Sequence, residues 1–173
     1  MKLTWFGGGC LRVYAGGQIV VLAPEMAPAA VDRGELLAGA DRIVGAREVL
    51  PTIDGASWRP QAMPRLLEDT PAAEVARIGD ALLVAVAGEP ALIVLGAGEL
   101  PRFGRWADGA VLVVTCAREG LVTEIAALLD AARLRLLVLA VDEQTLDAAV
   151  AALAGRLDGT GLVSLEAGLA LEV

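Results

Sequence analysis

The chain has 173 residues, of which 56% are hydrophobic and 21% charged, so one domain with a sizeable core is expected. A net charge of −8 and 14 scattered basic residues argue against a nucleic-acid partner, because a phosphate-binding surface needs clustered cations. Histidine is absent, which excludes Ser-His-Asp and Cys-His catalysis and the common histidine-containing zinc sites.

The apolar runs are too short for a membrane span, which needs roughly 18 residues. Three glycines interrupt the N-terminal segment MKLTWFGGGC, where a signal peptide has a continuous apolar stretch. We therefore expect a cytoplasmic protein without a membrane partner. Cys10 and Cys116 lie far apart beside apolar strand residues and lack the paired spacing of zinc ligands. We interpret both as structural, and we expect no metal ion and no cofactor.

The first third of the chain predicts short strands joined by glycine turns, with a proline-rich loop after the third strand. Strands are expected at residues 3–6, 11–15, 18–23 and 42–45, and a short helix at residues 31–39. Residues 51–71 carry four prolines and predict irregular structure, with one possible helical turn at residues 64–69.

Continuous apolar runs in the second half are typical of strands that are covered on both faces. Strands are expected at residues 74–79, 81–88, 90–96, 110–116 and 134–141, and amphipathic helices at residues 119–133 and 143–157. Residues 88–90 predict a hairpin turn, and residues 161–173 predict another hairpin that turns at residues 166–168. Hairpins followed by alternating strands and helices indicate sheet layers with helices packed outside. We expect one domain, residues 1–173, of the α/β (α+β) class.

Five segments follow one another along the chain: LTWFGGGC, IVVLAP, ADRIVGAREVLPTID, ALIVLGAGE and VSLEAGLALEV. In order and local sequence they resemble the metallo-β-lactamase superfamily, in its branch of small bacterial metal-dependent hydrolases. Members of that branch carry a G-H-A-C-like turn after the first strand and a T-H-x-H-x-D-H signature after a later strand. A strand ending in H-A-G-D follows. The resemblance implies a four-layer αββα sandwich, trimmed because this chain is shorter than typical members.

The metal-binding residues of that family are missing at the matching positions. At the His, His, Asp and His positions of the signature stand Arg47, Val49, Pro51 and Thr52. The remaining His and Asp positions of the family fall on Gly8, Ala23, Gly96 and Val141. Glu99, at the Asp position of H-A-G-D, keeps a side chain of the ligand type. A catalytic zinc site needs roughly three protein ligands and a bound water. The resemblance therefore implies a pseudoenzyme with no catalytic residues.

The former active-site positions supply the candidate ligand-binding residues, which are Arg47, Glu48, Thr52 and Glu99. Arginine suits carboxylates and phosphates. The alternative is that Arg47 and Glu48 form a solvated charge pair and that Glu99 caps a turn or faces solvent. Trp58 and Trp106 lie in loop-like contexts and either pack in the core or line a pocket or an interface.

Two functions remain open at this level. The first is a non-catalytic module for ligand binding or assembly, with a small molecule in the former active-site cleft. The high apolar fraction favours a homo-oligomer, in which surplus apolar surface is covered. The alternative is a divergent metal-dependent hydrolase, in which carboxylates around Glu99 act as acid–base groups or hold Mg²⁺. If the resemblance is wrong, the chain is another α/β domain, which a parallel sheet in its first half would indicate.

Overall fold

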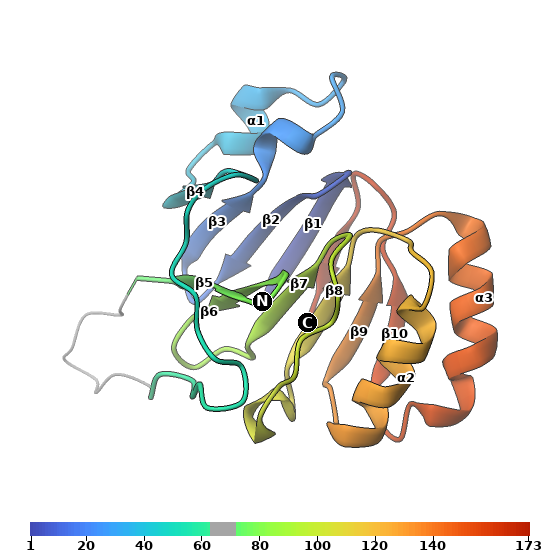
Figure 1. Cartoon of the computed structure of the whole chain (residues 1–173). Coiled ribbons are helices and arrows are strands. Elements are labelled where there is room, and N and C mark those ends of the chain that lie inside the picture. Colours follow the sequence, from blue (N-terminus) through green and yellow to red (C-terminus); the bar gives the residue numbers. More distant parts are fainter. Residues whose placement is uncertain (63–71) are drawn as a thin grey trace.

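The computed structural model describes residues 1–62 and 72–173, and this part of the chain forms two β-sheets and three α-helices (Figure 1). Both sheets contain parallel and antiparallel strand pairs, so the fold is mixed α/β, as expected. The helical turn predicted at residues 64–69 lies outside the described residues. No helix in the described part is long and apolar enough to cross a membrane.

The first sheet consists of β1 (Lys2–Gly7), β2 (Cys10–Ala15), β3 (Gln18–Leu22), β4 (Arg42–Val44) and β11 (Ala170–Glu172). Its strand order is β11-β1-β2-β3-β4. The turn Gly16-Gly17 joins β2 to β3, and both glycines have the positive φ angles that a tight hairpin requires. The helix α1 (Arg33–Leu37) precedes β4, which pairs parallel to β3. Asp32 caps the start of α1 by accepting a hydrogen bond from Glu35 N.

The second sheet has the order β10-β9-β8-β7-β6-β5. Its strands are β5 (Glu74–Ile78), β6 (Ala81–Ala85), β7 (Leu92–Leu95), β8 (Val111–Val114), β9 (Leu136–Leu139) and β10 (Gly161–Ser164). The neighbours β5, β6 and β7 pair antiparallel, and β7 to β10 run parallel. Parallel strands need crossover connections. The helices α2 (Leu121–Ala131) and α3 (Glu143–Leu153) provide the last two of these.

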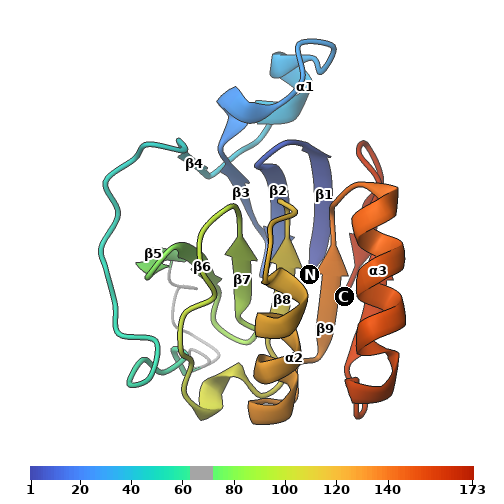
Figure 2. The ribbon, with the colours of Figure 1, turned by 45° about the vertical axis from the view of Figure 1, so that its right-hand side comes forward.

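The two sheets pack face to face, and α2 and α3 cover the far face of the second sheet (Figure 2). Alternation along each strand divides its side chains between two cores. In β7, for example, Leu92 faces the first sheet and Ile93 faces the helices. On the outer face of the first sheet, Leu36 of α1 packs with Cys10 and Val21. In the described residues, the helical layer expected on this face is thus reduced to α1 and a 3₁₀ helix (Pro24–Met26) at one end of the sheet.

The strands and helices predicted outside residues 51–71 are confirmed with shifted ends. One prediction is wrong, because residues 161–173 do not form a hairpin. The turn is present, but β10 pairs parallel to β9 in one sheet and β11 pairs antiparallel to β1 in the other. Leu165 N donates to Leu139 O at 3.0 Å, and Gly168 N donates to Trp5 O at 2.7 Å. The turn therefore carries the chain from the second sheet to the first.

Candidate functional site

The parallel strands β7, β8 and β9 end along one edge of the second sheet, at the upper end of that sheet in Figure 1. Ligands of open α/β sheets bind beyond the carboxyl ends of such strands. The loops that follow these strands carry Glu99, Arg118 and Asp142. This edge, which we call the strand-end edge, and the loop after β4 are where the sequence resemblance places the former active site.

An ion pair between Arg118 and Glu124 organises this edge. Arg118 donates to both carboxylate oxygens of Glu124, with a distance of 2.7 Å for Nη1–Oε1, and its Nε donates to Gly98 O at 2.8 Å. Glu124 Oε2 also accepts a hydrogen bond from Leu100 N at 2.9 Å. Glu124 lies in the first turn of α2, so the pair clamps the loop after β7 to the start of this helix.

The electrostatics of the clamp keep both groups charged. The hydrogen bonds from Arg118, and then the one from Leu100 N, lower the pKa of Glu124 from its ordinary 4.5 to about 2. The hydrogen bond to Glu124 in turn raises the pKa of Arg118, with smaller contributions from Glu99 and Cys116. A general acid or base needs a pKa near the working pH. Glu124 therefore serves as a structural anchor for the loop.

Glu99 is exposed, and its backbone rather than its side chain is fixed. Its N–H donates to Asp80 Oδ2 at 3.0 Å, in the turn between β5 and β6. A Cβ at Gly98 would lie 2.1 Å from Asp80 Cβ, so this loop packs closely on that turn. Among the described residues, no group of three or more His, Cys, Asp and Glu side chains is arranged to hold a metal ion.

The loop after β4 is held mainly through its own polar groups. Glu48 Oε2 accepts from Gly45 N at 3.2 Å, and Oε1 pairs with Arg42 at 2.9 Å. Glu25 reaches across from the 3₁₀ helix and accepts from Ala46 N at 2.5 Å. Arg47 is exposed and has no side-chain partner in the part of the chain that the structure describes. Of the predicted charge pair, Glu48 therefore binds its own turn and Arg42, while Arg47 extends into solvent.

Thr52 lies at the edge of the second sheet. It forms an isolated parallel bridge with Arg77 of β5. The hydrogen bonds come from its neighbours, because Pro51 O accepts from Arg77 N at 2.8 Å and Ile53 N donates to Arg77 O at 2.9 Å. Across residues 1–62 and 72–173, no hydrogen bond or ion pair joins Arg47, Glu48 or Thr52 to Glu99. Thr52 thus belongs to a segment that covers an exposed strand edge.

Two glycines mark positions where the resemblance places family histidines. Gly8 has a φ of +55°, and a Cβ there would lie 2.7 Å from the backbone oxygen of Met26. A side chain at this position would be strained and would collide with backbone. At Gly96, in contrast, a Cβ would meet nothing within 4 Å. A side chain is therefore sterically excluded at Gly8 and has room at Gly96.

The two loop tryptophans pack against each other. The ring centroids of Trp58 and Trp106 are 4.7 Å apart, and those of Phe103 and Trp106 are 5.6 Å apart, both in edge-to-face geometry. Trp106 Nε1 donates to Gly55 O at 2.6 Å. Trp58 Nε1 donates to Glu74 at 3.1 Å. These contacts favour the packing interpretation of the sequence, and they fix the position of Phe103.

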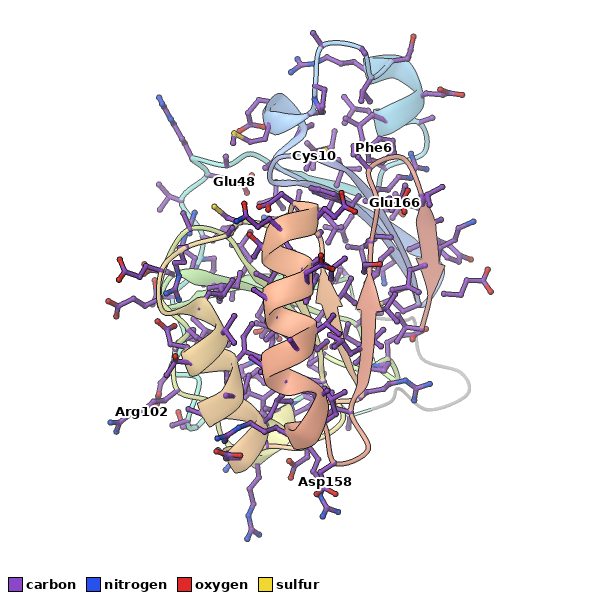
Figure 3. The ribbon with its side chains drawn as sticks, turned by 90° about the vertical axis from the view of Figure 1, so that its right-hand side faces the viewer. Phe6, Cys10, Glu48, Arg102, Asp158 and Glu166 are labelled. Atoms are coloured by element: carbon purple, nitrogen blue, oxygen red, sulfur yellow. The ribbon has the colours of Figure 1, made fainter. Side chains whose placement is uncertain are left out.

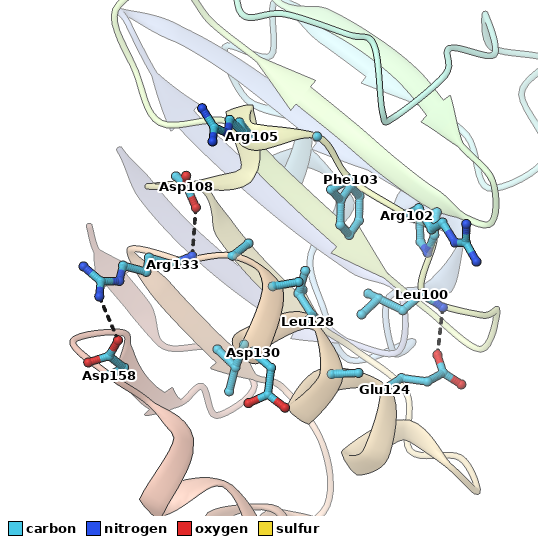
Figure 4. A pocket seen from close by; sticks show the side chains of 16 residues that line it. Leu100, Arg102, Phe103, Arg105, Asp108, Glu124, Leu128, Asp130, Arg133 and Asp158 are labelled. Carbon is cyan, nitrogen blue, oxygen red and sulfur yellow. Dashed lines mark hydrogen bonds and ion pairs between the residues drawn. The ribbon is translucent and has the colours of Figure 1, made fainter.

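A groove of about 1010 Å³ lies between the 100–108 loop and α2, and none of the candidate residues of the sequence lines it (Figure 4). We call it the α2 groove; residues 100–105, Asp108, Glu124, residues 127–133 and Asp158 line it. Leu100, Phe103 and Leu128 form its apolar part. Two sequence patterns belong to this groove. Phe103 stands between two arginines, and the predicted helix at residues 119–133 is rich in alanine. Neither pattern distinguishes a groove from ordinary packing.

Comparison of the chain with protein-family models, with curated proteins and with solved structures found no match. What the strand-end edge and the α2 groove can do is therefore inferred from their own residues.

Proposed function

We propose that this chain is a non-catalytic domain on a trimmed metallo-β-lactamase-type scaffold, acting as a binding or assembly module. The observation that carries this proposal is that the carboxylates beside Glu99 already bind groups of the chain itself. Asp80 accepts from the Glu99 N–H, and Glu124 is paired with Arg118 and with Leu100 N. A hydrolase needs carboxylates that are free to bind a metal ion or to transfer a proton. These two instead hold the protein's own loops.

Two further observations support the scaffold and the loss of chemistry. Two mixed sheets face each other and helices cover the second sheet, which corresponds to three of the four layers that the resemblance implies. At Gly8 the backbone conformation and the carbonyl of Met26 leave no room for a histidine. Because most of the expected metal ligands are missing, the role that this scaffold can still serve is to bind partners through its surfaces.

The proposal is tested on untagged protein, because a histidine tag binds metal itself. Metal content is measured by mass spectrometry after incubation with Zn²⁺, Mn²⁺ or Mg²⁺ and dialysis, and hydrolysis is assayed with a chromogenic β-lactam and a nitrophenyl phosphodiester. We expect far less than stoichiometric metal and no hydrolysis above the buffer rate. Stoichiometric metal together with turnover would overturn the proposal.

A divergent hydrolase is the second candidate, because Asp80 and Glu99 adjoin. Mg²⁺ often binds through one or two carboxylates plus substrate phosphates. In that case phosphodiester hydrolysis would require Mg²⁺, and both Asp80→Asn and Glu99→Gln would abolish it. Glu35→Gln, at an exposed carboxylate of α1 outside both surfaces, is the matched control.

A further inference from the structure

The helices α2 and α3 form the helical layer on the second sheet, and the solvent-facing side of this layer carries few charges. In α3, no charged residue lies between Asp147 and Arg156, and Val150 in this interval is 42% exposed. In α2, Ala127 and Ala131 are exposed where they line the α2 groove. A helix at the surface of a monomer normally presents polar residues to water. The exposed alanines and Val150 thus leave apolar surface on this layer that a partner could cover.

The α2 groove also carries positive charge through Arg102 and Arg105. Of its acidic side chains, Glu124, Asp130 and Asp158 pair with arginines of the chain, and Asp108 accepts a hydrogen bond from the backbone N–H of Arg133 at 2.9 Å. Arg102 and Arg105 have no side-chain hydrogen bond or ion pair among the described residues. They extend outward from the loop on either side of Phe103 (Figure 4). The occupant of the groove should therefore combine carboxylates with apolar side chains.

The helix α3 has this complementary chemistry. Glu143 and Asp147 are exposed and lie four residues apart, on one side of the helix, and Val150 follows at the next turn. Neither carboxylate has a side-chain partner in the described ranges. In Figure 3, α3 stands at the front of the molecule, with α2 beside it and Arg102 beyond α2. The exposed side of α3 and the α2 groove thus belong to one continuous surface.

We propose that the α2 groove is the docking site for α3 of a second copy of this chain, in a two-fold symmetric dimer. When one surface carries both a groove and its complement, two copies can satisfy each other and the contact closes. Arg102 and Arg105 then face Glu143 and Asp147 of the other copy, and Val150 enters the apolar part of the groove. This inference rests on the assembly role in the proposed function and names its partner.

The test is sedimentation equilibrium of the full chain and of three double variants. We expect a dimer for the wild type. Arg102→Glu/Arg105→Glu and Glu143→Lys/Asp147→Lys should each raise the dissociation constant about a hundredfold or more, because each places like charges together. Mixing these two variants should restore a dimer, since both contacts of the mixed pair are then attractive. The control Lys2→Glu/Arg33→Glu changes the charge equally at exposed positions outside the helical layer and should leave the dimer intact.

Three results would overturn the proposal: a monomeric wild type, a dimer that both reversals leave unchanged, or reversed variants that do not recover on mixing. Circular dichroism of each variant separates a lost contact from a lost fold. The proposed function fails separately. If the protein is a dimer that binds stoichiometric metal and hydrolyses substrate, the interface stands and the non-catalytic role is refuted. If it is a metal-free monomer without hydrolysis, the non-catalytic role stands and the interface is refuted.

Discussion

Replacing Glu124 by Gln tests whether the clamp at the strand-end edge stabilises the fold. The Arg118 side chain is 17% exposed and that of Glu124 is 33% exposed, so water screens the pair only in part. A pKa of about 2 against the ordinary 4.5 corresponds to about 3 kcal/mol before screening. Because a third of the carboxylate side chain is exposed, we discount this to about 1 kcal/mol. We therefore expect Glu124→Gln to lower the free energy of unfolding by about 1 kcal/mol at neutral pH.

The sign of the pH dependence follows from the lowered pKa. A carboxylate whose pKa is lower in the folded state stabilises the fold fully above its unfolded pKa. This contribution decreases as the pH falls below 4.5 and is lost only below the folded-state pKa of about 2, where Glu124 is protonated in both states. The difference in unfolding free energy between the wild type and Glu124→Gln should accordingly shrink over this window and vanish below it.

Urea unfolding at several pH values, followed by the fluorescence of the buried Trp106, measures this difference. Glu35→Gln is the matched control, because Glu35 is an exposed carboxylate in the first turn of α1 and lies outside the α2 groove. Its replacement should cost about 0.5 kcal/mol or less. If Glu124→Gln costs no more than this control, or if its cost persists at the lowest pH, the clamp does not stabilise the loop as argued.

Three further predictions concern local features. Gly8→His should lower the free energy of unfolding by about 2 kcal/mol or more, through backbone strain and collision with the carbonyl of Met26. Gly96→His places its side chain in open space and should lower it by about 1 kcal/mol or less. The melting temperatures of the two variants measure this difference. Ellman's reagent should modify the half-exposed Cys116 in the folded protein. Cys10, whose pKa burial raises to about 11, should react only after urea unfolding. Ile53→Pro removes the N–H that binds the edge of β5 and should cost about 1 kcal/mol or more by urea unfolding.

Local patterns were sufficient for the strands and helices because each element has its own signature. The run LIVL of β7 is buried on both faces, and a continuous apolar run is what such a strand requires. The pair Gly16-Gly17 specifies a tight hairpin through its backbone freedom. At residues 161–173 the turn was equally visible, but a turn does not specify the partners of its flanking strands. Here β9 and β1, both distant in sequence, are those partners.

The candidate site was harder to predict, because its contacts join segments far apart in the chain. Arg118 and Glu124 are six residues apart, yet their role depends on Gly98 O and Leu100 N of another loop. Thr52 looked like a site position in the aligned segment, and its neighbours' backbone hydrogen bonds to Arg77 assign it to a strand edge. Alignment to a motif locates a segment in the chain, but it does not show which groups that segment contacts.

Both surfaces of this molecule contain engaged and unpaired charged groups, and they differ in which groups are engaged. At the strand-end edge Arg47 is unpaired among the described residues, but Glu48, Asp80 and Glu124 bind neighbouring groups of the chain itself, which stabilises loops and leaves these carboxylates little capacity for a ligand. Around the helical layer, Arg102 and Glu143 remain unpaired among the described residues. A polar group that already has its partner gains little from a ligand, because the new contact must replace an existing one. Association should therefore occur at the helical layer, even though the resemblance first directs attention to the strand ends.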